Sequence, residues 1–261
     1  MDDMATSFPV WRFSGEDKSS VQDMVVREFP LTVILNNREL VTLLCSPGKL
    51  KYLAIGFLFA EGLLKERSEI KQILVDAKKG VVRVATVAEE EPDSELFSKR
   101  FITSGCGRGA TFYNAADATS QKIESPMTIS ATDVYALVNQ FQHSSQLYRA
   151  TGGVHSAALC SHKDIIVFAE DIGRHNAIDK IFGECILNDI ATDDRMIITS
   201  GRISSEVLLK VAKRGIPILI SKSAPTDYGV ELADTLGVTL ISFVRGKRMS
   251  VYTHQQRVVA T

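Results

Sequence analysis

Hydrophobic and polar positions alternate in short segments through the first third of the chain. Residues 24–37 and 38–45 are each rich in β-branched and other apolar residues, and the two asparagines that end the first run are typical of a tight hairpin turn. The apolar stretch 46–64 is long enough for a helix, with Ser46 as its expected N-cap. Residues 80–87 predict a further strand. A hairpin, a helix and a strand in this order indicate a small α/β roll.

The rest of the chain has a different pattern. A helix is expected over residues 130–149, where apolar residues recur on one face, and short apolar runs then alternate with further helical segments. Buried strands that alternate with helices predict a largely parallel sheet covered on both faces. The expected fold class is α/β, with a small α/β domain at residues 21–95 and a three-layer α/β/α domain at residues 96–261. Residues 1–20 are expected to be irregular.

Composition and charge narrow the class of protein. Of the 261 residues, 45% are hydrophobic and 23% are charged, which is typical of a globular chain with a sizeable core. The formal net charge of −1 indicates no field that would attract nucleic acid. The longest apolar run, residues 52–60, is too short to span a bilayer, and the acidic N-terminus does not resemble a signal peptide. A cytoplasmic location without membrane attachment is therefore expected.

Four polar stretches follow predicted strands: "EDIGRHN", "TSGRISSE", "SKSAPT" and "FVRGKR". Ligands of open α/β sheets bind beyond the carboxyl ends of the strands. Glycine allows the backbone to approach a ligand, helix N-termini attract phosphate, and arginine binds phosphate with paired hydrogen bonds. The stretches therefore predict a site for a phosphorylated or nucleotide ligand. Its candidate residues are Arg174, His175, Arg202, Ser223, Arg245 and Arg248.

No zinc site is expected. Zinc needs three or four histidine, cysteine or acidic ligands at recognisable spacings, and the five histidines and four cysteines of this chain are widely separated, without a CxxC pair. His155 follows two glycines and is interpreted as facing a ligand site, with a structural histidine as the alternative.

The four cysteines have different sequence settings. Cys45, Cys160 and Cys185 lie in apolar strand or helix segments, where cysteine is usually a small buried hydrophobe. Cys106 lies between glycines in "GCGRG", with Arg108 two residues away. Backbone N–H groups and a nearby cation favour the thiolate form, which makes Cys106 the candidate reactive cysteine.

Taken together, these stretches resemble the FdhD family of formate dehydrogenase accessory proteins. The resemblance covers roughly residues 28 to 254, with the motifs in family order. It implies that the second domain is similar to the cytidine deaminase fold but lacks the zinc ligands of the deaminases. The motifs that carry it are "LAIGFLFAEGLL", "TSGCG", "TGGVHSAAL", "EDIGRHNAIDK", "SGRISSE", "SAPTDYGVELA" and "FVRGKRMSVYT".

The resemblance implies sulfur transfer in a homodimeric protein. Such proteins accept sulfur from a cysteine desulfurase as a cysteine persulfide, here on Cys106. They pass it to the molybdenum cofactor, bis(molybdopterin guanine dinucleotide), which is then used by formate dehydrogenase. GDP is the expected fragment of that cofactor. The family's cofactor-binding segment matches Phe243, Val244, Arg245, Gly246, Lys247 and Arg248, to which the polar turns add His155, Arg174, His175, Arg202 and Ser223.

One position departs from the pattern of many family members, which have CxxC where this chain has "CGRG". Gly109 occupies the place of the second cysteine. Two other functions stay open on the residues alone. One is a hydrolase with Cys106 as nucleophile and His155 or His175 as base. The other is a nucleotide-binding module without sulfur chemistry.

Overall fold

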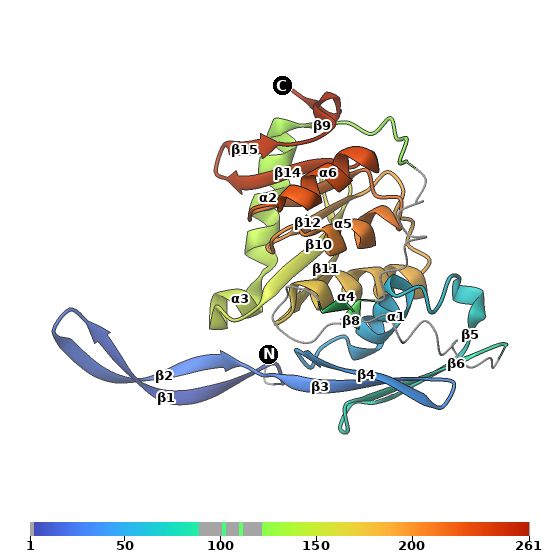
Figure 1. The fold of residues 1–261 in the computed structure, drawn as a ribbon. Coiled ribbons are helices and arrows are strands. Elements are labelled where there is room, and N and C mark those ends of the chain that lie inside the picture. Colours follow the sequence, from blue (N-terminus) through green and yellow to red (C-terminus); the bar gives the residue numbers. More distant parts are fainter. Residues whose placement is uncertain (1–2, 89–100, 103–109, 112–121, 261) are drawn as a thin grey trace.

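The computed structural model describes residues 3–88, 101–102, 110–111 and 122–260. Figure 1 shows a mixed α/β molecule with a smaller sheet below, a larger layered body above, and a long two-stranded ribbon that projects to one side. The expected fold class is confirmed, although the limits of the two domains stay a prediction. The shortest elements of the described structure are β7 (Phe101–Ile102), β8 (Ala110–Thr111), β9 (Ile129–Ser130), β16 (Val258–Val259) and two 3-10 turns, Arg67–Glu69 and Gln255–Arg257.

The smaller sheet contains the predicted hairpin. Asn36 and Asn37 both have positive φ angles, 46° and 67°, which is the conformation that a tight hairpin turn requires. Helix α1 (Leu50–Ala60) packs its apolar residues on this sheet. The strands are β3 (Phe29–Leu35), β4 (Arg38–Cys45), β5 (Ile70–Asp76) and β6 (Val81–Thr86), in the order β4-β3-β6-β5.

The N-cap predicted for α1 is wrong. Helix α1 begins after Lys49, whose backbone is left-handed, and Ser46 lies before it. The Ser46 hydroxyl instead accepts a hydrogen bond from Ile172 N–H at 3.2 Å, and Ser46 N–H donates to the Asp171 carboxylate at 3.0 Å. A long-range contact therefore takes the place of the local cap that the sequence favours.

The larger sheet has six strands in the order β11-β10-β12-β13-β14-β15. Only the β12–β13 and β13–β14 pairs are parallel, so the expectation of a largely parallel sheet is wrong. The reason is chain length: short turns join β10 to β11 and β14 to β15, which leaves no room for a crossover. The strands are β10 (His155–Cys160), β11 (Ile165–Asp171), β12 (Met196–Thr199), β13 (Ile218–Ser221), β14 (Thr239–Arg245) and β15 (Arg248–Val251).

Helices cover both faces of this sheet, as expected for a three-layer arrangement (Figure 1). Alternate strand residues point to opposite faces, so two apolar clusters form. One cluster joins the sheet to α4 (Arg174–Leu187), α5 (Ser205–Ala212) and α6 (Asp227–Thr235). The other joins it to α2 (Ala131–Ser144), which is followed by a separate short helix, α3 (Gln146–Thr151). The single helix expected over residues 130–149 is therefore divided at Ser145.

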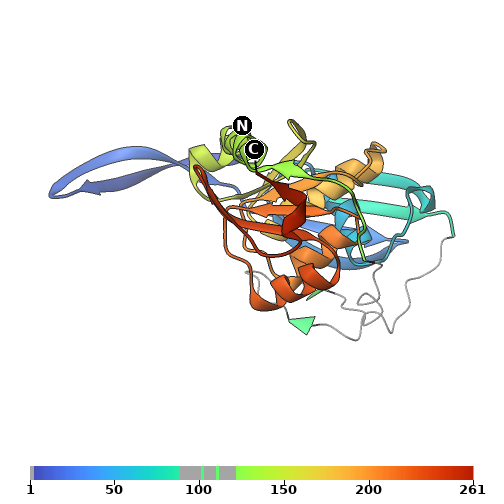
Figure 2. The same ribbon diagram turned by 90° about the horizontal axis from the view of Figure 1, so that it is seen from above.

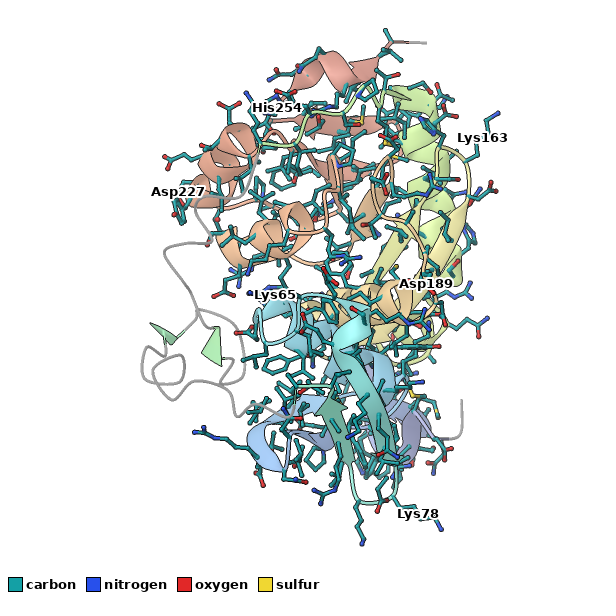
Figure 3. The ribbon with its side chains drawn as sticks, turned by 90° about the vertical axis from the view of Figure 1, so that its right-hand side faces the viewer. Lys65, Lys78, Lys163, Asp189, Asp227 and His254 are labelled. Atoms are coloured by element: carbon teal, nitrogen blue, oxygen red, sulfur yellow. The ribbon has the colours of Figure 1, made fainter. Side chains whose placement is uncertain are left out.

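The two bodies meet where α1 crosses α4, and Figure 3 shows them stacked, with Lys78 and His254 toward opposite ends. Two glycines permit the close approach. A Cβ atom on Gly183 would lie 1.9 Å from the Tyr52 carbonyl oxygen, and one on Gly56 would lie 1.9 Å from the Asp179 carbonyl oxygen. The backbones of the two helices are thus in direct contact.

The N-terminal residues are not irregular. Strands β1 (Ala5–Ser14) and β2 (Asp17–Val26) pair along their whole length as an antiparallel ribbon, which projects away from the body in both Figure 1 and Figure 2. The expectation for residues 1–20 is therefore wrong, because regular backbone pairing forms here without a buried apolar face. Among the described residues, no helix is both long and apolar enough to cross a bilayer.

Candidate functional site

A cavity of about 1020 Å³ lies at the edge of the large sheet where β12 and β13 end. Because β10 runs antiparallel to β12, the start of β10 reaches the same edge as the end of β12. The corner between α2 and α3 forms the opposite wall. Five residues that the following paragraphs use line the cavity: His155, Ser200, Lys222, Ser223 and Arg245.

A hydrogen-bond network fixes the start of β10 against the end of β12. Ser156 N–H donates to the Ser200 hydroxyl at 3.0 Å, and Ser200 N–H donates to the Ser156 carbonyl oxygen at 3.0 Å. The same Ser200 hydroxyl lies 3.3 Å from His155 Nδ1. The His155 ring is therefore held at the cavity wall by two strands rather than by a flexible loop.

The network continues into the helical wall. The hydroxyls of Ser145 and Ser156 are 2.9 Å apart, and both side chains are buried. Ser145 Oγ also donates to the Phe141 carbonyl oxygen at 3.1 Å. Ser145 stands between α2 and α3, so its bonds place the α2–α3 corner beside the strand ends.

Two cationic side chains approach the cavity from neighbouring strands. Lys222 follows β13, and its N–H donates to the Thr199 carbonyl oxygen at 3.2 Å. Burial, and then the charge of Arg245, lowers the pKa of Lys222. The Arg245 charge is thus close enough to affect Lys222, and an anion between the two would relieve their repulsion. This wall is suited to phosphate.

A second group of charged residues lies near His155. Burial lowers the pKa of His155, and the charges of Arg174 and Arg202 lower it further, so the ring is neutral at pH 7. Burial, followed by the charges of Lys210 and Arg174, lowers the pKa of His175 to about 3. The contact of 3.3 Å from His175 Nε2 to Glu206 is therefore not an ion pair at neutral pH.

The residues of the predicted cofactor segment have different positions. Gly246 and Arg245 line the cavity, as His155 and Ser223 do. Phe243 is 40% exposed, has a positive φ of 55°, and donates its N–H to the Ser223 carbonyl oxygen at 3.4 Å. Val244 is buried in the core between sheet and α2. Lys247 and Arg248 are exposed at the β14–β15 turn.

Cys106, with Gly109, lies outside the described residues. The other three cysteines are buried, as the sequence predicted. Burial raises the pKa of Cys45 and of Cys160 to about 12, and that of Cys185 to about 11, so these thiols stay protonated at neutral pH. In the described part of the chain, no three histidine, cysteine or acidic side chains are grouped as metal ligands.

Several cavity residues were not singled out from the sequence. Lys222 and Ser200 lie inside polar stretches that the sequence marked, but their individual places depend on strand register. Tyr148 and Arg149 line the cavity from α3, where the sequence predicted only the end of a longer helix. The serine pair "SS" at residues 144–145 is the signal that could have indicated a helix break there.

Comparison with known proteins gives consistent matches over almost the whole chain. The family model described as FdhD/NarQ family matches residues 26–259. The sulfur carrier protein FdhD of Bacillus subtilis is 45% identical over 260 residues, covering 99% of each chain, and that of Bacillus pumilus is 48% identical over 237 residues, covering 90% of each. A crystal structure described as a putative formate dehydrogenase accessory protein from Desulfotalea psychrophila matches with a TM-score of 0.82 and 25% identity, covering 98% of this chain and 100% of that one.

Proposed function

This chain belongs to the FdhD/NarQ family, and on that premise we propose that it is a sulfur carrier that serves formate dehydrogenase. The observation that carries the proposal is the match at 45% identity, over 99% of both chains, to a protein named for this function. The cavity with its cationic wall supports the second half of the task, which is to hold the acceptor of the sulfur.

The proposed first step is persulfide transfer to Cys106. The Cys106 thiolate attacks the terminal sulfur of a persulfide on a cysteine desulfurase. One S–S bond forms and one breaks, the donor cysteine leaves as a thiolate, and no external oxidant is needed. The three buried cysteines cannot compete, because burial keeps their pKa values near 11 or 12. This makes the protein sulfurtransferase-like, with a covalent intermediate on one side chain.

The proposed acceptor is the molybdenum cofactor with its guanine dinucleotide arms, a substrate rather than a resident group. The cavity, at about 1020 Å³, is as large as the pockets that hold drug-sized ligands. Lys222 and Arg245 would hold phosphate oxygens, and the neutral His155 ring can donate or accept a hydrogen bond beside them. Arg174 and Arg202 add positive charge near that ring. GDP is the simplest fragment that tests this assignment.

Gly109 affects the lifetime of the proposed intermediate. A second thiol at that position could attack the persulfide, form a disulfide and release sulfide. This chain has glycine there, and its next cysteine in sequence is Cys160, which is buried. The persulfide on Cys106 is therefore expected to persist until the acceptor arrives. The full proposal comprises a cytoplasmic homodimer that meets a cysteine desulfurase and formate dehydrogenase in turn.

The test is genetic complementation of a strain that lacks this protein. We expect wild-type protein to restore formate dehydrogenase activity and Cys106→Ala to restore none, while Cys160→Ala, a matched cysteine change outside the proposed chemistry, restores it. Equal activity with Cys106→Ala would contradict the proposal and favour a cofactor-binding module without sulfur chemistry. Turnover of an acyl or amide substrate that depends on Cys106 would favour the hydrolase instead.

A further inference from the structure

Helix α3, which lines the ligand cavity through Tyr148 and Arg149, is too short to be stable alone. It has six residues, whereas isolated helices of fewer than about 12 residues are marginal in water. The residue at its N-cap position, Ser145, forms no side-chain cap on this helix. The position of this cavity wall therefore depends on contacts from outside the helix.

The carboxylate of Glu170 takes the place of the missing cap. One of its oxygens accepts a hydrogen bond from Leu147 N–H at 3.1 Å, and the other accepts one from Tyr148 N–H at 2.9 Å. The first turn of a helix has N–H groups without partners in the helix, and the positive end of the helix dipole also lies there, so a carboxylate stabilises it. Both oxygens of Glu170 are thus used to hold α3.

Glu170 is itself held firmly in the large sheet. It lies in β11 opposite Ser156 of β10, and its carbonyl oxygen accepts a hydrogen bond from the buried Lys180 ammonium at 3.2 Å. Residues opposite one another in an antiparallel pair share a face of the sheet. Ser156, which bonds to Ser145 just before α3, therefore lies on the same face as Glu170. Two neighbouring sheet residues thus fix the direction in which α3 leaves the end of α2.

Packing contributes less to the position of α3 than these hydrogen bonds do. Leu147 is the one residue of α3 that is buried, in a small cluster with Ala5 and Val154. The far end of the helix is closed locally, because Gly152 has a positive φ of 65° and donates its N–H to the Tyr148 carbonyl oxygen at 2.7 Å. The contact from Glu170 is therefore the main link between α3 and the sheet.

Arg149 is the charged side chain that α3 brings to the cavity. It is exposed and lines the same cavity as Lys222 and Arg245, which lie on the wall formed by the strand ends. Among the described residues, no carboxylate forms an ion pair with Arg149, so its guanidinium donors are available to a ligand. Arginine binds phosphate with paired hydrogen bonds. A ligand with two phosphates can therefore contact cations of both walls, whereas a nucleoside without phosphate contacts none of them in this way.

We propose that Glu170 is a positioning residue of the ligand site, which holds α3 so that Arg149 contacts the phosphate oxygens of a nucleoside diphosphate. This inference rests on the proposed function, in which the cavity receives the guanine dinucleotide part of the acceptor. It adds Arg149 to the cations that touch the ligand. It also adds a residue, Glu170, that affects binding without touching the ligand, because it acts through Arg149.

A double-mutant cycle tests this relationship, with affinities measured by calorimetric titration of the full chain. Arg149→Ala should lower GDP affinity about 10- to 150-fold, as expected for loss of a charge-assisted contact, and should leave guanosine affinity within about twofold.

Glu170→Gln keeps the size of the side chain but places an amide donor against one of the two N–H groups, so GDP affinity should fall about tenfold. In the Arg149→Ala background, the same change should alter GDP affinity by less than about twofold, because the contact that Glu170 positions is already gone. Glu231→Gln is the matched control, because Glu231 is exposed on α6, and it should leave GDP affinity unchanged.

Three results would overturn the proposal. One is an equal fall in GDP affinity on Glu170→Gln in both backgrounds, because Glu170 would then have only a general structural role. Another is wild-type affinity for GDP in Arg149→Ala, an exposed change that decides the matter even if Glu170→Gln does not fold. The third is a wild type that binds no GDP. Persulfide formation on Cys106, which none of these changes should alter, separates a failure of this inference from a failure of the proposed function.

Discussion

The ammonium of Lys180 lies 2.6 Å from the carboxylate of Asp171, and both side chains are buried almost completely. Asp171 also accepts hydrogen bonds from Ser46 N–H at 3.0 Å and from the Asn176 side chain at 2.9 Å. Lys180 donates to the Ser46 carbonyl oxygen at 3.2 Å. This buried ion pair thus fastens the turn before α1 to the turn before α4, the helix that begins with Arg174 and His175.

Breaking this pair is expected to destabilise the fold strongly. Lys180→Met leaves the Asp171 carboxylate buried without its counter-charge, which typically costs about 3–5 kcal/mol. Urea unfolding of the wild type and the variant measures this loss. The exposed pair Lys79–Asp76, at 3.9 Å, is the control, and Lys79→Gln should change stability by less than about 1 kcal/mol. Equal effects of the two changes would contradict the structural role of the buried pair.

The close approach of α1 and α4 predicts that one methyl group added at Gly183 destabilises the fold. Gly183→Ala would place Cβ 1.9 Å from the Tyr52 carbonyl oxygen, so the helices must separate. Overpacking of this kind costs roughly 1–3 kcal/mol, which thermal unfolding would detect. Gly48→Ala is the comparison, because its Cβ would meet only the flexible end of Met4, at 3.0 Å. If Gly183→Ala is as stable as Gly48→Ala, the helices do not approach as closely as described.

Acid should destabilise the protein through His175. Burial, mainly, lowers the pKa of His175 in the folded state from 6.5 to about 3. The unfolded chain therefore binds a proton between these pH values that the folded chain does not. The contribution of His175 to the free energy of unfolding is fully present above pH 6.5. It decreases as the pH falls toward 3, by at most about 1.4 kcal/mol per pH unit. The free energy of unfolding of His175→Gln should fall less steeply from pH 7 to pH 4, whereas parallel curves would contradict the assignment.

The buried cysteines should resist alkylation in the folded protein. Burial raises the pKa of Cys45 and Cys160 to about 12, so almost no thiolate is present at pH 8. Iodoacetamide followed by peptide mapping should label Cys45, Cys160 and Cys185 only after denaturation. Labelling of any of the three at the same rate before and after addition of urea would show that these sites open in the native state.

Nucleotide affinity should depend on the cations of the cavity wall. Removing Arg245 or Lys222 by substitution with alanine deletes a charge-assisted contact, and GDP affinity should fall about 10- to 150-fold. Guanosine should bind more weakly than GDP because it lacks the phosphates. Arg248→Ala should have a smaller effect, since Arg248 is exposed beyond the lining, and Lys78→Ala, on the β5–β6 turn, should have none. Calorimetric titrations that give equal GDP affinities for all variants would exclude this wall as the phosphate site.

Local signals in the sequence predicted local structure well. Ser130, a residue type that favours helix N-caps, does cap α2: its hydroxyl accepts a hydrogen bond from Asp133 N–H at 3.0 Å, and the contact spans only three residues. Ser46 looked equally suitable, yet its partners are Asp171 and Ile172, more than a hundred residues away. The ribbon was missed for a related reason. It lacks an alternation that separates a buried from an exposed face, because neither face is buried along most of its length.

The site could be predicted only in outline. His155, Ser223, Arg245 and Gly246 do line one cavity, since strand ends converge at one edge of the sheet. The helical wall could not be foreseen, because the division between α2 and α3 depends on the buried contact from Ser145 to Ser156. The role assigned to Cys106, which is to carry the persulfide, stays a prediction, and the central claim depends on it.

That claim is tested most directly by peptide mass spectrometry after the protein is incubated with a cysteine desulfurase and cysteine. We predict that the peptide containing Cys106 gains about 32 Da for each added sulfur atom, in a form that dithiothreitol removes. Peptides with Cys45, Cys160 and Cys185 should gain none, because these thiols are buried and protonated. Added sulfur that is absent from Cys106, or found chiefly on one of the three buried cysteines, would contradict the account.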